Sequence, residues 1–181
     1  MRRFEGAGVG ALAALVATGV MAGAGAAAAP SGGPIALSAG VGSNPTQKIV
    51  VAGAIGDWGT VHPVDRSGKP DQNGNFVKVL LKKGSFELDV TAVNKAMSNP
   101  RPQVQSDVTC SVAAVGSGAA KLFDGTGLYK GISGTVNVTI TFTGVGGRYQ
   151  SGAKKGQCSR GGEPLAMLGS VVGHGTVRFS G

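Results

Sequence analysis

The sequence predicts an all-β protein whose single antiparallel domain is preceded by a signal peptide. Several stretches alternate apolar and polar residues with a period of two, which is typical of strands with one buried face. No long amphipathic helix is visible after residue 30. Roughly seven or eight strands in one compact domain must hide their edges, so a sandwich or a closed barrel is expected.

The first 28 residues are expected to be the signal peptide. Arg2 and Arg3 precede an uncharged stretch with an apolar centre and several small residues at its end. That apolar centre is shorter than the roughly 20 residues that a membrane-spanning helix needs. We therefore expect cleavage near Ala26 or Ala28, a secreted protein and no membrane span after cleavage.

The next segment, residues 29–46, is small, polar and rich in Pro and Gly. This composition is typical of a flexible leader. The barrel domain is accordingly expected to occupy residues 47–181.

Strands are expected in the following order along the domain: 49–55, 76–82, 86–90, 107–115, 119–123, 135–142 and 169–179. A short helical turn is expected at 93–97. In the third of these strands, Phe86, Leu88 and Val90 share one face, so Glu87 and Asp89 should point outward. The alternation in each strand indicates sheets with one face in the core and the other in water.

Glycines in the last strand favour a barrel over a sandwich. Gly173 and Gly175 lie on the same face as Val171 and Val177, so they take inward positions. A glycine at such a position is typical of a sharp bend or of a close approach by a neighbouring strand.

The two cysteines, Cys110 and Cys158, are predicted to form a disulfide, because an exported chain meets an oxidising compartment. The bridge should fasten the long loop that precedes Cys158 and contribute about 4 kcal/mol in the chain-entropy model. Only His62 and His174 could join the cysteines in a metal site, so no metal and no cofactor are expected.

The net charge of +8 bears on partners. Basic residues are scattered among the strands and are not interleaved with aromatic residues, so nucleic acid is not an expected partner. The positive charge of this basic protein could serve the binding of an anionic cell-surface polymer, or it could serve only to keep the protein soluble.

A glycine-rich stretch, "GTGLYKGISGTV", is predicted to close one end of the barrel. Gly125 and Gly127 allow a turn with positive φ, and one helical turn then packs Leu128 or Tyr129 over the barrel end. Gly131 and Gly134 are expected to end this turn and to begin the next strand. A phosphate-binding loop is the alternative, but the lysine motif and the helix that such loops need are missing.

The same stretch resembles the G-[TS]-G-x-[FY]-x-G-x-x-G-x-[VA] signature of plant allene oxide cyclases and dirigent proteins, and more closely that of secreted bacterial proteins with the same barrel. The resemblance rests on Gly125, Thr126, Gly127, Tyr129, Gly131, Gly134 and Val136. It implies an eight-stranded antiparallel β-barrel. The catalytic acids of the plant families cannot be carried over to positions in this chain.

The expected function is therefore non-catalytic binding of a small apolar ligand or of a cell-surface partner. The candidate ligand-binding residues are Trp58, Arg148 and Tyr149, which we expect at the barrel mouth. The disulfide should hold in place the loop that carries Arg148 and Tyr149. Trp58 could instead plug the barrel end. An isomerase or cyclase acting on an apolar substrate is the alternative function, and an open cavity with an inward acid would favour it.

Overall fold

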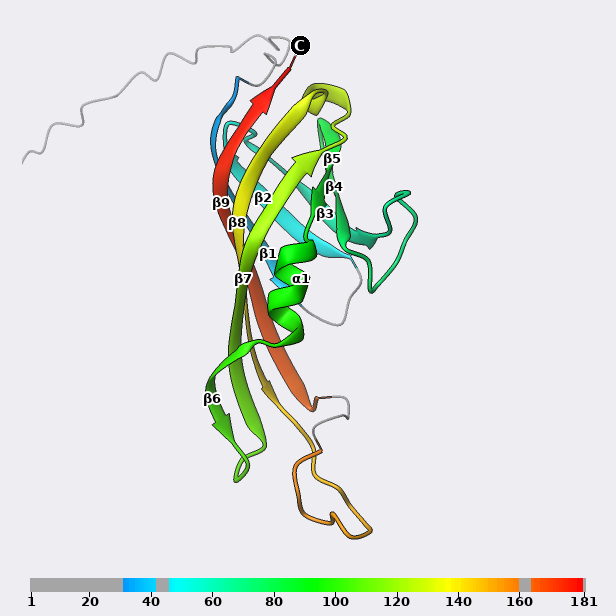
Figure 1. The fold of residues 1–181 in the computed structure, drawn as a ribbon, viewed down its shortest axis with the longest axis vertical. Helices are drawn as coiled ribbons and strands as arrows, with labels where there is room; N and C mark the ends of the chain where they lie inside the picture. Colours follow the sequence, from blue (N-terminus) through cyan, green and yellow to red (C-terminus); the bar gives the residue numbers. More distant parts are fainter. Residues whose placement is uncertain (1–30, 42–45, 160–163, 181) are drawn as a thin grey trace, which may run out of the picture.

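The computed structural model describes residues 31–41, 46–159 and 164–180. Within these ranges the chain forms one antiparallel sheet (Figure 1). The strands are β1 (Gly33–Val41), β2 (Gln47–Gly53), β3 (Asp57–Val64), β4 (Phe76–Leu81), β5 (Gly84–Asp89), β6 (Arg101–Ser106), β7 (Ser111–Phe123), β8 (Ile132–Val145) and β9 (Ala166–Phe179). The helices are α1 (Thr91–Ser98) and the 3-10 turn η1 (Gly127–Tyr129).

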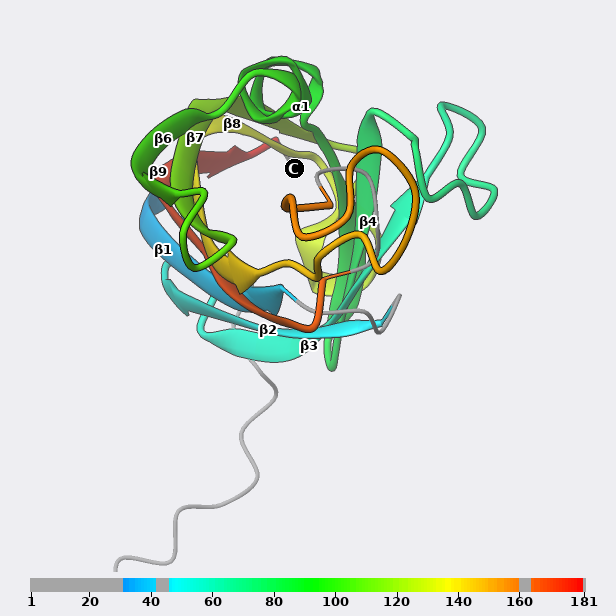
Figure 2. The ribbon, with the colours of Figure 1, turned by 90° about the horizontal axis from the view of Figure 1, so that it is seen from below.

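All of these strands except β6 close into an eight-stranded barrel, which is seen along its axis in Figure 2. The strand order is β1-β2-β3-β4-β5-β7-β8-β9, and β9 returns to pair with β1. Closure between β5 and β7 uses pairs such as Leu88 with Leu122. The predicted all-β fold and the eight-stranded antiparallel barrel are confirmed.

The strands β7, β8 and β9 are long and run past the end of the barrel (Figure 1). There β6 leaves the barrel wall and pairs with the first part of β7, from Ser111 to Val115. We call residues 101–115, 141–145 and 166–170 the extension. The loop between β8 and β9 hangs from the extension at the lower end of the molecule in Figure 1, and in the view from below it lies in front of part of the barrel opening (Figure 2).

The predicted flexible leader over residues 29–46 is wrong for residues 33–41, which form β1. Ile35 and Leu37 are buried in the core, and β1 pairs with β2 on one side and β9 on the other. A barrel cannot close without this strand. The signal peptide over residues 1–28 and its cleavage positions lie outside the described residues.

The end of the barrel near η1 is filled by side chains. Phe86 points inward as predicted and is buried there, as are Val51, Val79 and Val136, while Leu88, also inward as predicted, is buried farther along β5. The helix α1 lies at the other end, against the inner face of β7. A Cβ atom on Gly118 would lie 2.7 Å from the α1 backbone at Ala92, so this glycine is what lets the helix approach.

Two predicted boundaries in the middle of the chain are also wrong. The strand expected at 107–115 begins at Ser111, because Asp107 to Cys110 form a turn in which Cys110 has a φ of 54°. Val108 is therefore 83 % exposed and shares no buried face with Cys110. From Ser111 the strand β7 runs without a break to Phe123, so it also contains the strand expected at 119–123.

Candidate functional site

The closed end of the barrel is held by a hydrogen bond between Tyr129 and Asp57. Gly127, the first residue of η1, and Gly131, which follows the helix, have φ of 58° and 74° and turn Tyr129 into the barrel, as predicted. The Tyr129 side chain is 1 % exposed, and its ring meets Phe86 edge to face at 6.0 Å. Its hydroxyl donates to Asp57 Oδ2 at 2.6 Å. Tyr129 is thus the residue that plugs the barrel.

The Asp57 carboxylate is 7 % exposed, and both of its oxygens accept hydrogen bonds. Besides Tyr129, the backbone N–H groups of Lys83 and Trp58 donate to it at 3.0 and 2.8 Å. Burial raises the pKa of Asp57, but these hydrogen bonds outweigh burial and hold the pKa below its ordinary value. Burial, with the adjacent carboxylate, raises the pKa of Tyr129. The pair therefore stays ionised at Asp57 and protonated at Tyr129 at neutral pH.

The other end of the barrel contains a cavity of about 250 Å³, which we call the barrel cavity. Its walls come from β1 to β5, β8, β9 and α1, with Leu37, Ile49, Leu88, Val138 and Ile140 among the apolar lining residues. The inward side chains of the barrel therefore fill the interior near η1 and leave a cavity near α1.

The polar side chains that line the barrel cavity are the amides Gln47, Gln72 and Asn94. The Asn94 amide donates to the Gly74 carbonyl and to Asn75 Oδ1, each at 3.1 Å, so its hydrogens are directed to the chain rather than to the lumen. Among the described residues, no carboxylate, amine or imidazole lines this cavity. A site of this kind can hold an apolar molecule by burying its surface.

The inner face of β8 continues from the barrel cavity onto the extension. Val138 and Ile140 line the barrel cavity, and Phe142 and Gly144, which follow on the same face, line a second hollow of about 370 Å³. The disulfide and Met167 bound this second hollow. The inner face of β8 thus contributes residues first to the barrel cavity and then to the hollow beside the disulfide.

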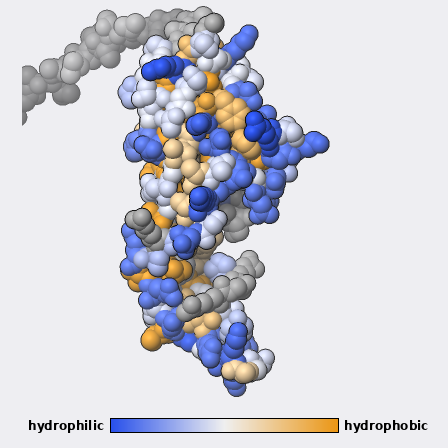
Figure 3. All heavy atoms as spheres, in the orientation of Figure 1, coloured by the Kyte–Doolittle hydropathy of each residue, from blue (hydrophilic) through white to orange (hydrophobic). Residues whose placement is uncertain are grey.

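The extension also exposes apolar side chains on its outside. Figure 3 shows apolar surface interspersed with polar surface over this part of the molecule. The exposed apolar side chains include Val104, Val108, Met167 and Leu168.

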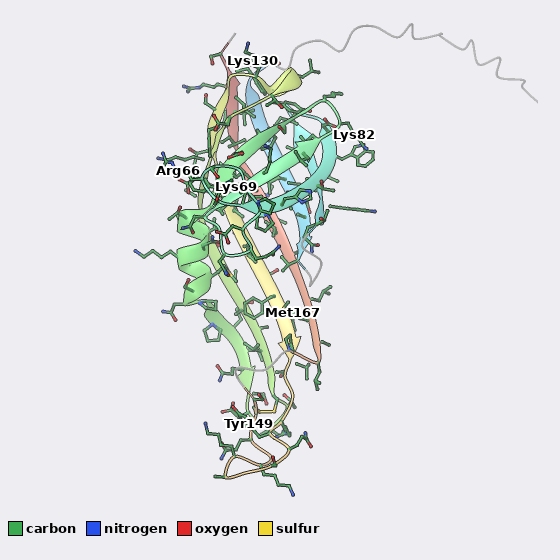
Figure 4. The ribbon with its side chains drawn as sticks, turned by 90° about the vertical axis from the view of Figure 1, so that its right-hand side faces the viewer. Arg66, Lys69, Lys82, Lys130, Tyr149 and Met167 are labelled. Carbon is green, nitrogen blue, oxygen red and sulfur yellow. A yellow bond between two sulfur atoms is a disulfide. The ribbon has the colours of Figure 1, made fainter. Side chains whose placement is uncertain are left out.

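The structure does not bring Trp58 together with Arg148 and Tyr149. Trp58 is 57 % exposed on the outer face of the barrel, with Lys82 Nζ 4.3 Å from the centre of its ring, so it neither lines the mouth nor plugs the barrel. Tyr149 lies at the far end of the molecule from Lys82 (Figure 4). None of the three candidate residues lines the barrel cavity.

Arg148 has a structural role in the loop between β8 and β9. Its guanidinium donates to the carbonyl of Gly156 at 2.5 Å and to the carbonyl of Val108 in the turn between β6 and β7. These bonds tie the loop to itself and to the extension. Both terminal nitrogens of the guanidinium therefore already donate to main-chain carbonyls.

The predicted disulfide between Cys110 and Cys158 is confirmed, with the Cα atoms 5.3 Å apart. It fastens the loop between β8 and β9 to the turn before β7, as expected. The described residues of this loop, up to Ser159 and from Pro164, contribute no side chain to the barrel cavity. Our expectation that this bridge holds the ligand-binding residues at the barrel mouth is not supported by their positions.

The cavity residues that the sequence prediction missed lie on β1, β3 and α1. Leu37 and Ala39 line the cavity from β1, Val61 from β3 and Val93 from α1. A period-two signal was present in β1, where Ile35, Leu37 and Ala39 alternate with other residues. The surrounding Gly, Ser and Pro residues concealed it.

The fold and the cavity define a class, that of antiparallel β-barrels with an apolar lumen open at one end. Comparisons with protein-family models, with curated proteins and with solved structures found no match to this chain. No helix in the described residues is long and apolar enough to cross a membrane. The described residues also contain no cluster of three or more His, Cys, Asp or Glu side chains that could hold a metal ion.

Proposed function

We propose that the protein is an exported binding protein that holds a small apolar ligand in the barrel cavity and does not transform it. The observation that carries this proposal is the barrel cavity, about 250 Å³ with a mainly apolar lining. Small-molecule sites usually measure about 300 to 1,000 Å³. The ligand should therefore be small, or should project toward the hollow on the extension.

The composition of the lining supports binding over the alternative of an isomerase or cyclase. Acid–base chemistry needs a titratable side chain within reach of the substrate, and none of the described lining residues has one. The inward acid of this barrel, Asp57, does not line the cavity and has three hydrogen-bond donors on its carboxylate.

Two finer assignments complete the proposal. The glycines of the signature at 125–136 occupy turns and close contacts at the barrel end, which supports membership of the allene oxide cyclase and dirigent-like barrels. Export is supported by the layout of residues 1–28 and by the disulfide, since such bridges persist in oxidising compartments.

The test is a variant that fills the cavity. Ala39 points into the barrel cavity from β1, and Ser38, its neighbour, is exposed on the outside. We expect Ala39→Phe to weaken the binding of an uncharged apolar dye, N-phenyl-1-naphthylamine, by roughly tenfold or more, because the ring occupies the lumen. Ser38→Phe is the matched control and should bind the dye as the wild type does.

Dye fluorescence is the appropriate signal, because Trp58 lies outside the barrel and will not report on the lumen. Circular dichroism and Tm establish that both variants are folded. No dye binding by the wild type, or equal binding by the two folded variants, would contradict the proposal. If the dye results support the proposal, native mass spectrometry of protein purified from the secretion medium would identify a co-purified ligand.

A further inference from the structure

The outer face of β2, β3 and β4 presents three neighbouring apolar side chains to solvent. Val50 is directly opposite Trp58 in the β2–β3 register, and Leu80 is opposite Thr60, which adjoins Trp58 on the same face of β3. Val50, Trp58 and Leu80 are 57, 57 and 40 % exposed. Single exposed apolar residues are common on protein surfaces, whereas a group of neighbouring apolar residues on one face of a sheet indicates contact with a partner or a membrane.

Lysines border this apolar group. Lys48 is opposite Thr60 in the β2–β3 register, and Lys82 Nζ lies 4.3 Å from the centre of the Trp58 ring. The closest acidic residue in the neighbouring β4–β5 register is Glu87, which is buried and lies 3.8 Å from Lys78. We call Lys48, Val50, Trp58, Leu80 and Lys82 the Trp58 face, and its charge is positive.

We propose that the Trp58 face docks the protein onto the surface of an anionic phospholipid bilayer. Tryptophan favours the level of the lipid headgroups, where its apolar body and its N–H group are both accommodated. Lysines near the surface are attracted to anionic lipids. The aliphatic side chains of Val50 and Leu80 would lose contact with water at the same boundary.

The details of the face favour a bilayer over an anionic polysaccharide. A sugar ring is recognised by stacking on a free aromatic face with hydrogen-bonding groups around it, but Lys82 already covers one face of the Trp58 ring. Val50 and Leu80, which adjoin it, offer no hydrogen bonds. These two residues suit hydrocarbon better than hydroxyl groups.

A second copy of the chain is also disfavoured by the charges. A two-fold contact places the same patch on both subunits, so Lys48 and Lys82 of each copy would face a patch with the same lysines. Such like-charge contacts are unfavourable. A negatively charged surface meets no such repulsion.

This docking does not depend on a ligand in the barrel. The strands β2 and β3 line the lumen through Ile49 and Val61 on their inner faces, while Val50 and Trp58 point out from the same strands. The barrel would lie on its side against the bilayer, with the cavity walled off from the lipid.

The experiment uses the wild-type chain and vesicles of phosphatidylcholine, with or without an equal part of phosphatidylglycerol. The sequence contains one tryptophan, so its fluorescence reports this face alone. We expect co-sedimentation with the anionic vesicles, a shift of the Trp58 emission to shorter wavelength, and quenching by lipids with brominated acyl chains. Neutral vesicles and high salt should each weaken the effect.

The variant Lys48→Gln with Lys82→Gln should bind the anionic vesicles about 25-fold more weakly, at about fivefold for each lysine. Lys121→Gln with Lys130→Gln removes the same charge elsewhere and should change binding less than threefold, roughly. Trp58→Ser, followed by co-sedimentation, should also weaken binding.

Four results would overturn the proposal. The first is that the wild type does not bind anionic vesicles, and the second is that both double-lysine variants lose the same amount of vesicle binding. The third is that Trp58→Ser binds as the wild type does, and the fourth is that the wild type binds without quenching of Trp58 fluorescence by the brominated chains. Binding of soluble polyphosphate in the last case would assign the face to an anionic polymer. Self-association in sedimentation that protects Trp58 from acrylamide in the absence of vesicles would assign it to a second copy.

Discussion

The hydrogen bond between Tyr129 and Asp57 should contribute measurably to stability, and Tyr129→Phe removes it without changing the packing of the ring. A hydrogen bond to a charged group contributes about 1.5 to 3 kcal/mol. Asp57 keeps the backbone donors of Trp58 and Lys83, so its charge is not left unpaired. We therefore expect a loss of about 2 kcal/mol in the free energy of unfolding at neutral pH and a Tm lower by roughly 6 °C.

The effect should depend on pH in a defined direction. The folded pKa of Asp57 is lowered, so its stabilising contribution is present above the ordinary value of 3.8 and is lost as the pH falls through the lower folded value. Removal of the Tyr129 donor moves the Asp57 pKa upward. The difference between wild type and Tyr129→Phe should thus be largest at neutral pH and smaller at about pH 3.

Urea unfolding at both pH values measures these differences. Tyr149→Phe is the control, because Tyr149 is an exposed tyrosine in a loop and its substitution should change stability by less than about 0.5 kcal/mol. A loss of less than about 0.5 kcal/mol for Tyr129→Phe at neutral pH, or the same loss at both pH values, would refute the reasoning.

Two further substitutions test the turns and the disulfide. Gly127→Val should lower stability by about 1 to 3 kcal/mol from backbone strain alone, because Gly127 has a φ of 58°, and its Cβ would also meet the Lys83 carbonyl; a Tm equal to that of the wild type would show that this glycine is not required. The double variant Cys110→Ser with Cys158→Ser should lose up to about 4 kcal/mol but keep its affinity for the apolar dye, since neither cysteine lines the barrel cavity. A large loss of dye affinity in folded protein would place the ligand in the hollow beside the disulfide instead.

The parts of the fold that the sequence predicted well are those where alternation is strong and turn chemistry is explicit. Phe86 and Leu88 alternate with charged residues, and the glycines around Tyr129 leave few other conformations open. The strands β3 and β6 were missed because Pro63 and Pro102 interrupt their patterns, and proline within a strand argues against the assignment.

The candidate site was harder to predict than the fold. Trp58 and Tyr149 were selected for their side-chain chemistry, but their position around the barrel depends on register and strand length, which sequence alternation does not determine. The cavity itself results from a gap in the packing of many ordinary apolar residues. Ala39 and Val61 carry no local signal that they border empty space.

The pairing of β1 with β9 has a consequence for how the chain folds. Gly33 near the start of the described chain is opposite Val177 near its end, so the ring of strands is completed by the two segments that are farthest apart in sequence. Contacts of such long range make folding slow, and a chain that still lacks its last strand exposes two unpaired edges, on β1 and β8. Truncation before Ala166 should therefore produce aggregation rather than a smaller folded protein, and the native ring can form only after β9 has been synthesised.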